Sequence, residues 1–174
     1  MWRGSESNVS AGWLPLDAYL TIQAHVLADF RSDGFLLEER LSLSEGGDER
    51  LLVEGRIRCR GGLFIDVEEF LAVRTARGRR HVRSVRYSFH AGIEGPLGLT
   101  IFRYDNHHSY LREGHPDAHH KHVFDPTTWA ERPPPEWIGE ERRRNLSDVI
   151  AELRQWWEAT GQHLGLSHSE DPHP

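Results

Sequence analysis

Apolar and polar residues alternate with a period of two between Gly34 and Asp105, and this pattern constrains the fold more than any other feature of the chain. Short turn-like segments interrupt the alternation, at residues 44–48, 61–62, 76–78 and 92–98. Alternation turns one side of a strand toward a core, and short turns join neighbouring strands in antiparallel order. The region therefore predicts a curved antiparallel meander of about five strands.

Two segments outside this region have the apolar spacing of amphipathic helices. Residues 16–31 bring Tyr19, Ile22, Val26 and Phe30 to one side. Residues 147–160, with the preceding Leu146, carry a second stripe, made of Leu146, Val149, Ile150, Leu153 and Trp157. Both stripes need an apolar sheet face to cover. The predicted fold class is therefore α+β, with the sheet packed by an N-terminal and a C-terminal helix.

Length and composition predict one globular domain. The 174 residues can bury a sizeable core, and we assign that domain to residues 14–163. Residues 1–13 are expected to be a flexible N-terminus, residues 131–136 a proline-rich linker, and residues 164–174 a disordered tail. No apolar run approaches the roughly 20 residues of a membrane helix, and the N-terminus lacks the apolar core of a signal peptide. A cytoplasmic protein without membrane contact is expected.

Charge is distributed unevenly along the chain. The formal net charge is −6, which argues against a protein that coats nucleic acid with its whole surface. Residues 74–86, however, contain six arginines and no acidic residue. Such a segment can hold phosphates through bidentate hydrogen bonds, or it can be a solvated hairpin. The only cysteine, Cys59, has the spacing of a core residue and excludes an internal disulfide.

Half of the twelve histidines fall between Asp105 and Phe124, around the only lysine of the chain, Lys121. We assign the site segment to residues 103–124. Its six histidines are His107, His108, His115, His119, His120 and His122. A short extra strand at 119–124 would place His120 and His122 on one side, and His119 and Lys121 on the other.

Two carboxylates are candidates to act with these histidines. Glu69 has aliphatic residues at the alternate positions of its strand, so it either points into the apolar side with a raised pKa or is turned to solvent by a β-bulge. Asp105 ends a strand next to two histidines, where a carboxylate can orient an imidazole. The simpler alternative for Asp105 is that it starts a turn.

The His119–His122 segment is compatible with three interpretations. Cleavage of a phosphodiester by acid–base chemistry needs a proton acceptor, a proton donor and cations, and histidines with a lysine provide all three. Transition-metal binding needs three ligands, such as His120, His122 and either Asp105 or a histidine of the 107–108 pair. A polar strand without chemistry is the third interpretation.

A family resemblance follows from three segments. The strand end Arg-Tyr-Asp-Asn-His-His at 103–108, the run His-His-Lys-His-Val at 119–123 and the closing Leu-x-x-Val-Ile-x-x-Leu helix resemble the TumE-like family. Its members are toxin components of prokaryotic toxin–antitoxin modules. The resemblance covers residues 50–157 and aligns Glu69 and Tyr87 with the family's acidic and aromatic strand residues. It implies an intracellular protein with an antitoxin partner encoded nearby, and it implies no mechanism.

The leading hypothesis is therefore a toxin-like protein that cleaves RNA without a required cofactor. Its predicted catalytic residues are His120 and His122 as acid and base, Asp105 and Glu69 as assisting carboxylates, together with Lys121 and His119. The predicted substrate-binding residues are Arg103, His107, His108, Tyr87 and Arg83.

Two alternatives use the same histidines differently. One is a metal-binding protein or metal-dependent hydrolase with a divalent transition metal. The other is a non-catalytic partner-binding module with three exposed anchors, Trp129, Trp137 and Trp156. The sequence leaves open whether the protein is a homodimer.

Overall fold

A computed structural model describes residues 12–95, 98–107 and 118–164 of the chain. The predicted tail therefore lies outside the described residues except for Leu164, and so do residues 1–11 of the predicted flexible N-terminus. The elements are β1 (Leu14–Pro15), α1 (Leu16–Ser32), β2 (Leu36–Glu45), β3 (Arg50–Cys59), β4 (Leu63–Ala76), β5 (Arg79–Ile93), β6 (Leu99–Asp105), β7 (His120–Val123), β8 (Glu136–Trp137) and α2 (Leu146–Ala159), with short 3-10 turns at Arg60–Gly62, Glu140–Arg142 and Gly161–Leu164.

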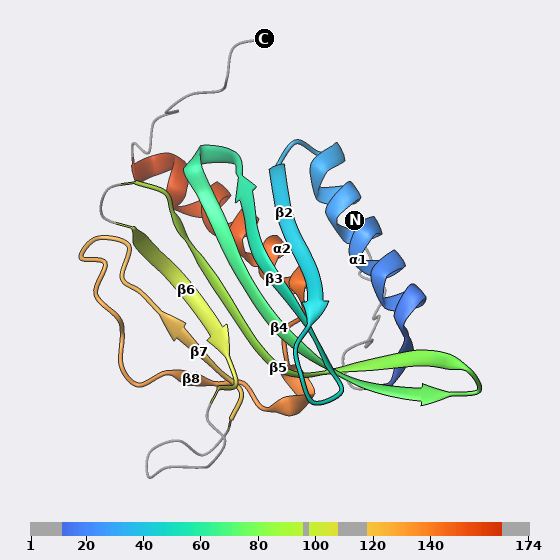
Figure 1. The fold of residues 1–174 in the computed structure, drawn as a ribbon. Helices are drawn as coiled ribbons and strands as arrows, with labels where there is room; N and C mark the ends of the chain where they lie inside the picture. The colour runs from blue at the N-terminus through green and yellow to red at the C-terminus, as the bar shows by residue number, and fades with distance from the viewer. Residues whose placement is uncertain (1–11, 96–97, 108–117, 165–174) are drawn as a thin grey trace.

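The strands form one antiparallel sheet in the order β2-β3-β4-β5-β6-β7-β8, and β1 pairs with β5 beside this path. The α+β class and the antiparallel meander are thus confirmed, with β2–β6 as the predicted strands (Figure 1). The expected number of about five strands is too low, because the sheet has eight. The two further edge strands β1 and β8 have two residues each, which is too short for a period-two pattern.

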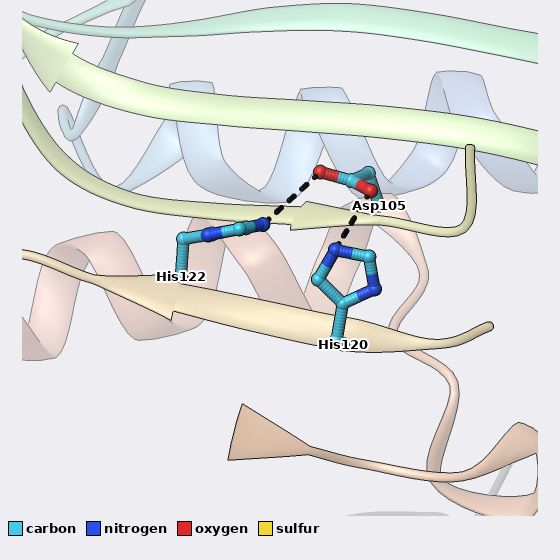
Figure 2. Close-up of side chains that lie close together, drawn as sticks. All are labelled: Asp105, His120 and His122. Atoms are coloured by element: carbon cyan, nitrogen blue, oxygen red, sulfur yellow. Dashed lines mark ion pairs between the residues drawn. The ribbon is translucent and has the colours of Figure 1, made fainter. Parts of the chain in front are cut away.

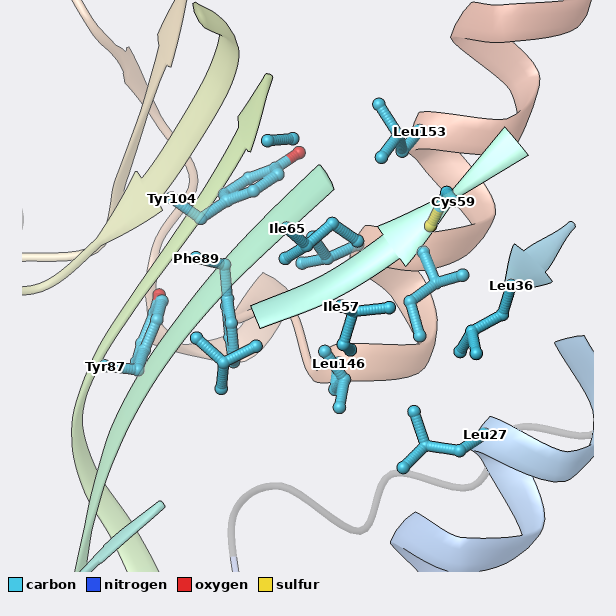
Figure 3. Close-up of a cluster of buried hydrophobic side chains, with 14 of the residues drawn as sticks. Leu27, Leu36, Ile57, Cys59, Ile65, Tyr87, Phe89, Tyr104, Leu146 and Leu153 are labelled. Atoms are coloured by element: carbon cyan, nitrogen blue, oxygen red, sulfur yellow. The ribbon is translucent and has the colours of Figure 1, made fainter. Parts of the chain in front are cut away.

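Both helices contact each other and pack on the same side of the sheet, which we call the helix face. Helix α2 begins at a capping box in which the side chain of Asn145 accepts from the Asp148 N–H and Asp148 accepts from the Asn145 N–H. Its apolar stripe packs against sheet residues such as Ile57 and Ile65 (Figure 3). We call the opposite side of the sheet the exposed face.

One bulge changes the direction of side chains in β2. The pairing of β2 with β3 shifts between Leu36 and Glu38, so Leu36 is buried while Leu37 is 55% exposed. Among the described residues, no helix is long and apolar enough to cross a membrane.

Candidate functional site

The pairing of β6 with β7 divides the predicted site residues between the two faces of the sheet. Asp105 lies opposite His120, and Tyr104 lies opposite Lys121. Residues directly opposite each other point to the same face, and successive residues alternate. Asp105, His120 and His122 therefore share the exposed face, whereas Lys121 shares the helix face with Tyr104. The predicted extra strand and its division into two sides are confirmed.

Asp105, His120 and His122 come together in what we call the His–Asp centre (Figure 2). His120 Nε2 lies 3.0 Å from Asp105 Oδ1, and His122 Nε2 lies 3.8 Å from Asp105 Oδ2. The three side chains are 0%, 11% and 6% exposed for His120, His122 and Asp105 respectively. Arg103, on the same strand as Asp105, places its Nε 2.8 Å from Asp105 Oδ2 and is 43% exposed. Arg103 thus connects the buried centre to the surface.

The other nitrogen of each imidazole contacts a hydrogen-bond acceptor. His120 Nδ1 lies 3.0 Å from the Ala118 carbonyl oxygen, and His122 Nδ1 lies 2.6 Å from Glu131 Oε1. A carbonyl and an ionised carboxylate only accept, so we assign a hydrogen to both Nδ1 atoms. Each Nε2 then faces Asp105 either with a second proton or with a lone pair that is available to a cation.

Asp105 and His120 shift each other's pKa in opposite directions. Burial alone would raise the pKa of Asp105, but the hydrogen bond and charge of His120, with the charge of Arg103, hold it well below its usual range. Burial alone would lower the pKa of His120, but the hydrogen bond and charge of Asp105 raise it above its ordinary value. Without a metal, the pair therefore favours a carboxylate beside an imidazolium.

The His–Asp centre also has the donor set of a transition-metal site. Nitrogen or oxygen atoms of its three residues all lie within 4.8 Å of one another. Imidazole nitrogens and a carboxylate oxygen are common ligands of Zn²⁺ and other divalent transition metals. Acceptors on the remote nitrogens, like Ala118 and Glu131 here, are the usual outer contacts that orient metal-binding histidines. The residues present fit a metal ion.

The remaining exposed-face candidates lie outside this centre. His107 turns its Nε2 toward Glu68 of β4, 3.3 Å from its Oε1, whereas His120 and His122 are on β7. His108 falls outside the described residues. Arg83 lies on β5, toward the β4–β5 turn. Of the described residues 105–107, Asp105 therefore joins His120 and His122, whereas His107 pairs with Glu68.

Four further candidates lie on the helix face. Glu69 is 12% exposed, accepts a 2.7 Å hydrogen bond from the Tyr19 hydroxyl and lies 3.7 Å from Arg143. The register shift of this region falls between Phe70 and Leu71, so it does not turn Glu69 to solvent. Tyr87 is fully buried, with its hydroxyl 3.1 Å from His119 Nδ1, and Lys121 Nζ lies 2.5 Å from Glu152 Oε1. Sheet and backbone separate these four residues from the His–Asp centre.

Several contacts in this region lack a signal in the sequence. Glu131, the partner of His122, lies nine residues away in the segment predicted as a linker. That segment runs beside β7, because the Arg132 N–H donates to the Val123 carbonyl. The predicted exposure of Trp129, Trp137 and Trp156 is wrong, since all three are half-buried. Trp137 packs on the His120 ring, with centroids 5.6 Å apart.

These features define a class of α+β protein, in which one side of an antiparallel sheet packs on two helices and the other carries a buried pair of histidines on a carboxylate. The family model described as Toxin TumE matches residues 24–157, which include the whole centre. The chain therefore belongs to the TumE family of toxins, and membership implies an antitoxin partner. The match begins earlier than the resemblance over 50–157 and takes in the second half of α1. No curated protein and no solved structure matches the chain.

Proposed function

We propose that this toxin cleaves RNA at the His–Asp centre, in the cytoplasm, and that its antitoxin restrains it. The observation that carries the proposal is the convergence of two imidazoles on one carboxylate beside the half-exposed Arg103. Phosphodiester cleavage needs proton transfer or a Lewis acid at the reacting oxygens, and a cation for the developing charge. The centre offers these groups within one small volume.

The first candidate chemistry is acid–base catalysis by histidine. His122 is the more exposed of the two imidazoles, 11% against 0% for His120, so we assign it the exchange of protons with the substrate. Asp105 and the fully buried His120 act as a positioning pair, and Arg103 faces the phosphate. The RNA 2′-oxygen gives its proton to His122 and bonds to phosphorus, and the bond to the 5′-oxygen breaks as His122 gives that oxygen a proton. The products are a 2′,3′-cyclic phosphate and a 5′-hydroxyl end.

The first experiment compares His122→Ala with a matched variant, His25→Ala, whose imidazole is exposed on α1. We expect H122A to abolish growth inhibition and to slow RNA cleavage in vitro at least 100-fold, the lower end of what a general acid or base contributes. H25A should change neither, and both variants should melt like the parent. Full toxicity of H122A would reject the assignment of catalysis to the His–Asp centre. Unchanged RNA with weaker antitoxin capture would instead support the non-catalytic binding module.

The second candidate chemistry is metal-dependent hydrolysis by the same residues. The specific observation in its favour is that both Nδ1 atoms are held by acceptors while both Nε2 atoms face Asp105. A divalent ion held by Asp105, His120 and His122 would lower the pKa of a bound water and neutralise phosphate charge. Water would then add to phosphorus as the ester bond breaks, which leaves a linear phosphate at one end and a hydroxyl at the other.

The second experiment separates the two chemistries in protein purified without a polyhistidine tag. If the centre holds a metal, we expect about one equivalent of zinc, manganese or nickel, loss of cleavage in a chelator, and recovery when the ion returns. Glu131→Ala should weaken metal binding about 10- to 100-fold, because it removes the acceptor that orients His122. Chelator-resistant cleavage with cyclic phosphate products would establish the metal-free chemistry.

A further inference from the structure

The hairpin that joins β4 and β5 extends beyond the rest of the sheet (Figure 1). The β3 strand pairs with β4 only as far as Ala72, and β6 pairs with β5 only from Ser88 onward. Past these points, residues 73–82 form a two-stranded ribbon, and the strand pairing that it makes with other described residues is the short one of β1 with His81 and Val82. A two-stranded ribbon of this kind is accessible from more than one side.

Arginines of this hairpin are exposed and only partly neutralised. Of the six arginines between 74 and 86, Arg80 pairs with Glu45 and Arg86 with Glu68. Within the described part of the chain, the other four form no ion pair with a carboxylate: Arg74, Arg77, Arg79 and Arg83. The guanidinium groups of Arg74 and Arg83 lie 4.3 Å and 5.3 Å from the centroid of the Trp13 ring. The protein as a whole is acidic, so this hairpin is a local concentration of positive charge.

Strand register places three of these arginines on one side of the hairpin. Arg83 lies opposite Ala72, His81 opposite Arg74, and Arg79 opposite Ala76. Because side chains alternate along each strand, Arg74, Arg79 and Arg83 point to the same face. The register shift between Phe70 and Leu71 inserts Val85 into β5, so the same face continues through Glu68 and Ser88. Ser88 lies opposite Asp105. The charged side of the hairpin is thus continuous with the exposed face beside the His–Asp centre. Arg83 and Ser88 are about 15 Å apart along β5, at a strand rise of about 3.3 Å per residue.

We infer that Trp13, Arg74, Arg79 and Arg83, together called the arginine surface, bind the backbone of single-stranded RNA and lead it to the His–Asp centre. The inference rests on the proposed function. Guanidinium groups bind phosphate oxygens bidentately, and an aromatic ring gives a base a surface on which to stack. Because the surface shares its face with the centre, a strand bound there runs toward Asp105, which favours RNA over an acidic segment of a partner protein.

The experiment measures binding of a fluorescent single-stranded RNA to full-length protein by anisotropy at several salt concentrations. The H122A variant serves as the parent, so that cleavage does not interfere. The test variant adds Arg74→Ala, Arg79→Ala and Arg83→Ala. The control adds three exposed arginines from outside the hairpin that lack ion pairs with described residues, Arg31→Ala, Arg60→Ala and Arg142→Ala. Both triple variants carry the same net charge, and their melting is compared with that of the parent.

We expect the test variant to bind RNA at least tenfold more weakly. The slope of log K against log salt should become shallower by about 2, since each lost phosphate contact removes about 0.7 for a single strand. The control should retain most of the affinity and the slope. Equal binding by both variants, or antitoxin binding lost with RNA binding retained, would overturn the inference. If RNA binding depends on the arginine surface but the wild-type protein does not cleave RNA, the proposed reaction would be rejected and the RNA-binding role of the arginine surface would be supported.

Discussion

Lys121 lies in the sequence directly between the two histidines of the centre, yet its ammonium group is on the other side of the sheet. It pairs with Glu152 of α2, which also accepts a 2.7 Å hydrogen bond from the Tyr104 hydroxyl. A cation held there is separated from a phosphate at Asp105 by the sheet. At the scale of one residue, the structure thus argues against the predicted role of Lys121 in stabilising phosphate charge.

We therefore predict that Lys121→Met lowers the thermal stability and leaves the rate of RNA cleavage unchanged. The cost should be about 1 kcal/mol, between that of an exposed and a buried ion pair, because the two side chains are 16% and 26% exposed. Thermal melts and cleavage assays on the same preparation check this. A large fall in rate with an unchanged melt would restore the catalytic role of Lys121.

At the scale of one element, α1 docks on the sheet through few buried residues. Within this helix, Tyr19 and Leu27 are its buried positions, and the Tyr19 hydroxyl donates to the nearly buried Glu69. Burial and the charge of Glu69 raise the pKa of Tyr19 well above its usual range, so this hydroxyl remains a donor. The contact couples α1 to β4 by a bond that a phenylalanine ring would lose without a change in shape.

We predict that Tyr19→Phe destabilises the protein by about 1–3 kcal/mol, the usual cost of leaving a buried acceptor without its donor. For a domain of this size, each kcal/mol corresponds to about 2–4 °C in Tm. In a double-mutant cycle with Glu69→Gln, the double mutant should lose less stability than the sum of the losses of the two single mutants. Simple additivity of the two losses would show that the hydrogen bond does not hold α1.

At the scale of the whole molecule, the two faces of the sheet carry different kinds of residues. The helix face buries the core, and its carboxylates Glu69 and Glu152 pair with neighbouring side chains. The exposed face carries the His–Asp centre and the arginine surface. Substitutions on the helix face should therefore act through stability, and substitutions on the exposed face through function.

Cys59 provides a probe of unfolding of the whole molecule, because it is the only thiol of the chain. It ends β3 in the core, is 2% exposed, and burial raises its pKa to about 12. We predict no reaction with a thiol reagent at pH 8 in the folded protein, and a labelling midpoint in denaturant equal to the midpoint from circular dichroism. Rapid labelling without denaturant would show that the core opens locally at this strand.

The sequence by itself determined the elements and their local directions. Alternation from Gly34 to Asp105 predicted β2–β6 in antiparallel order, and the spacing at 119–124 separated His120 and His122 from His119 and Lys121. It also predicted the inward direction of Glu69 as one of two alternatives. These properties follow from the geometry of a single strand, in which successive side chains point to opposite sides whatever the strand pairs with.

Only the tertiary structure decided which of these residues form one site. A bulge set by the pairing of β2 with β3 exposes Leu37, an apolar residue of the alternating region. The contacts of His122 with Glu131 and of Lys121 with Glu152 join segments whose spacing in the chain carries no pattern. The position of both helices on one face then left Glu69, Tyr87, His119 and Lys121 on the side away from the His–Asp centre. Pairing partners and helix packing are non-local, so no pattern within one segment specifies them.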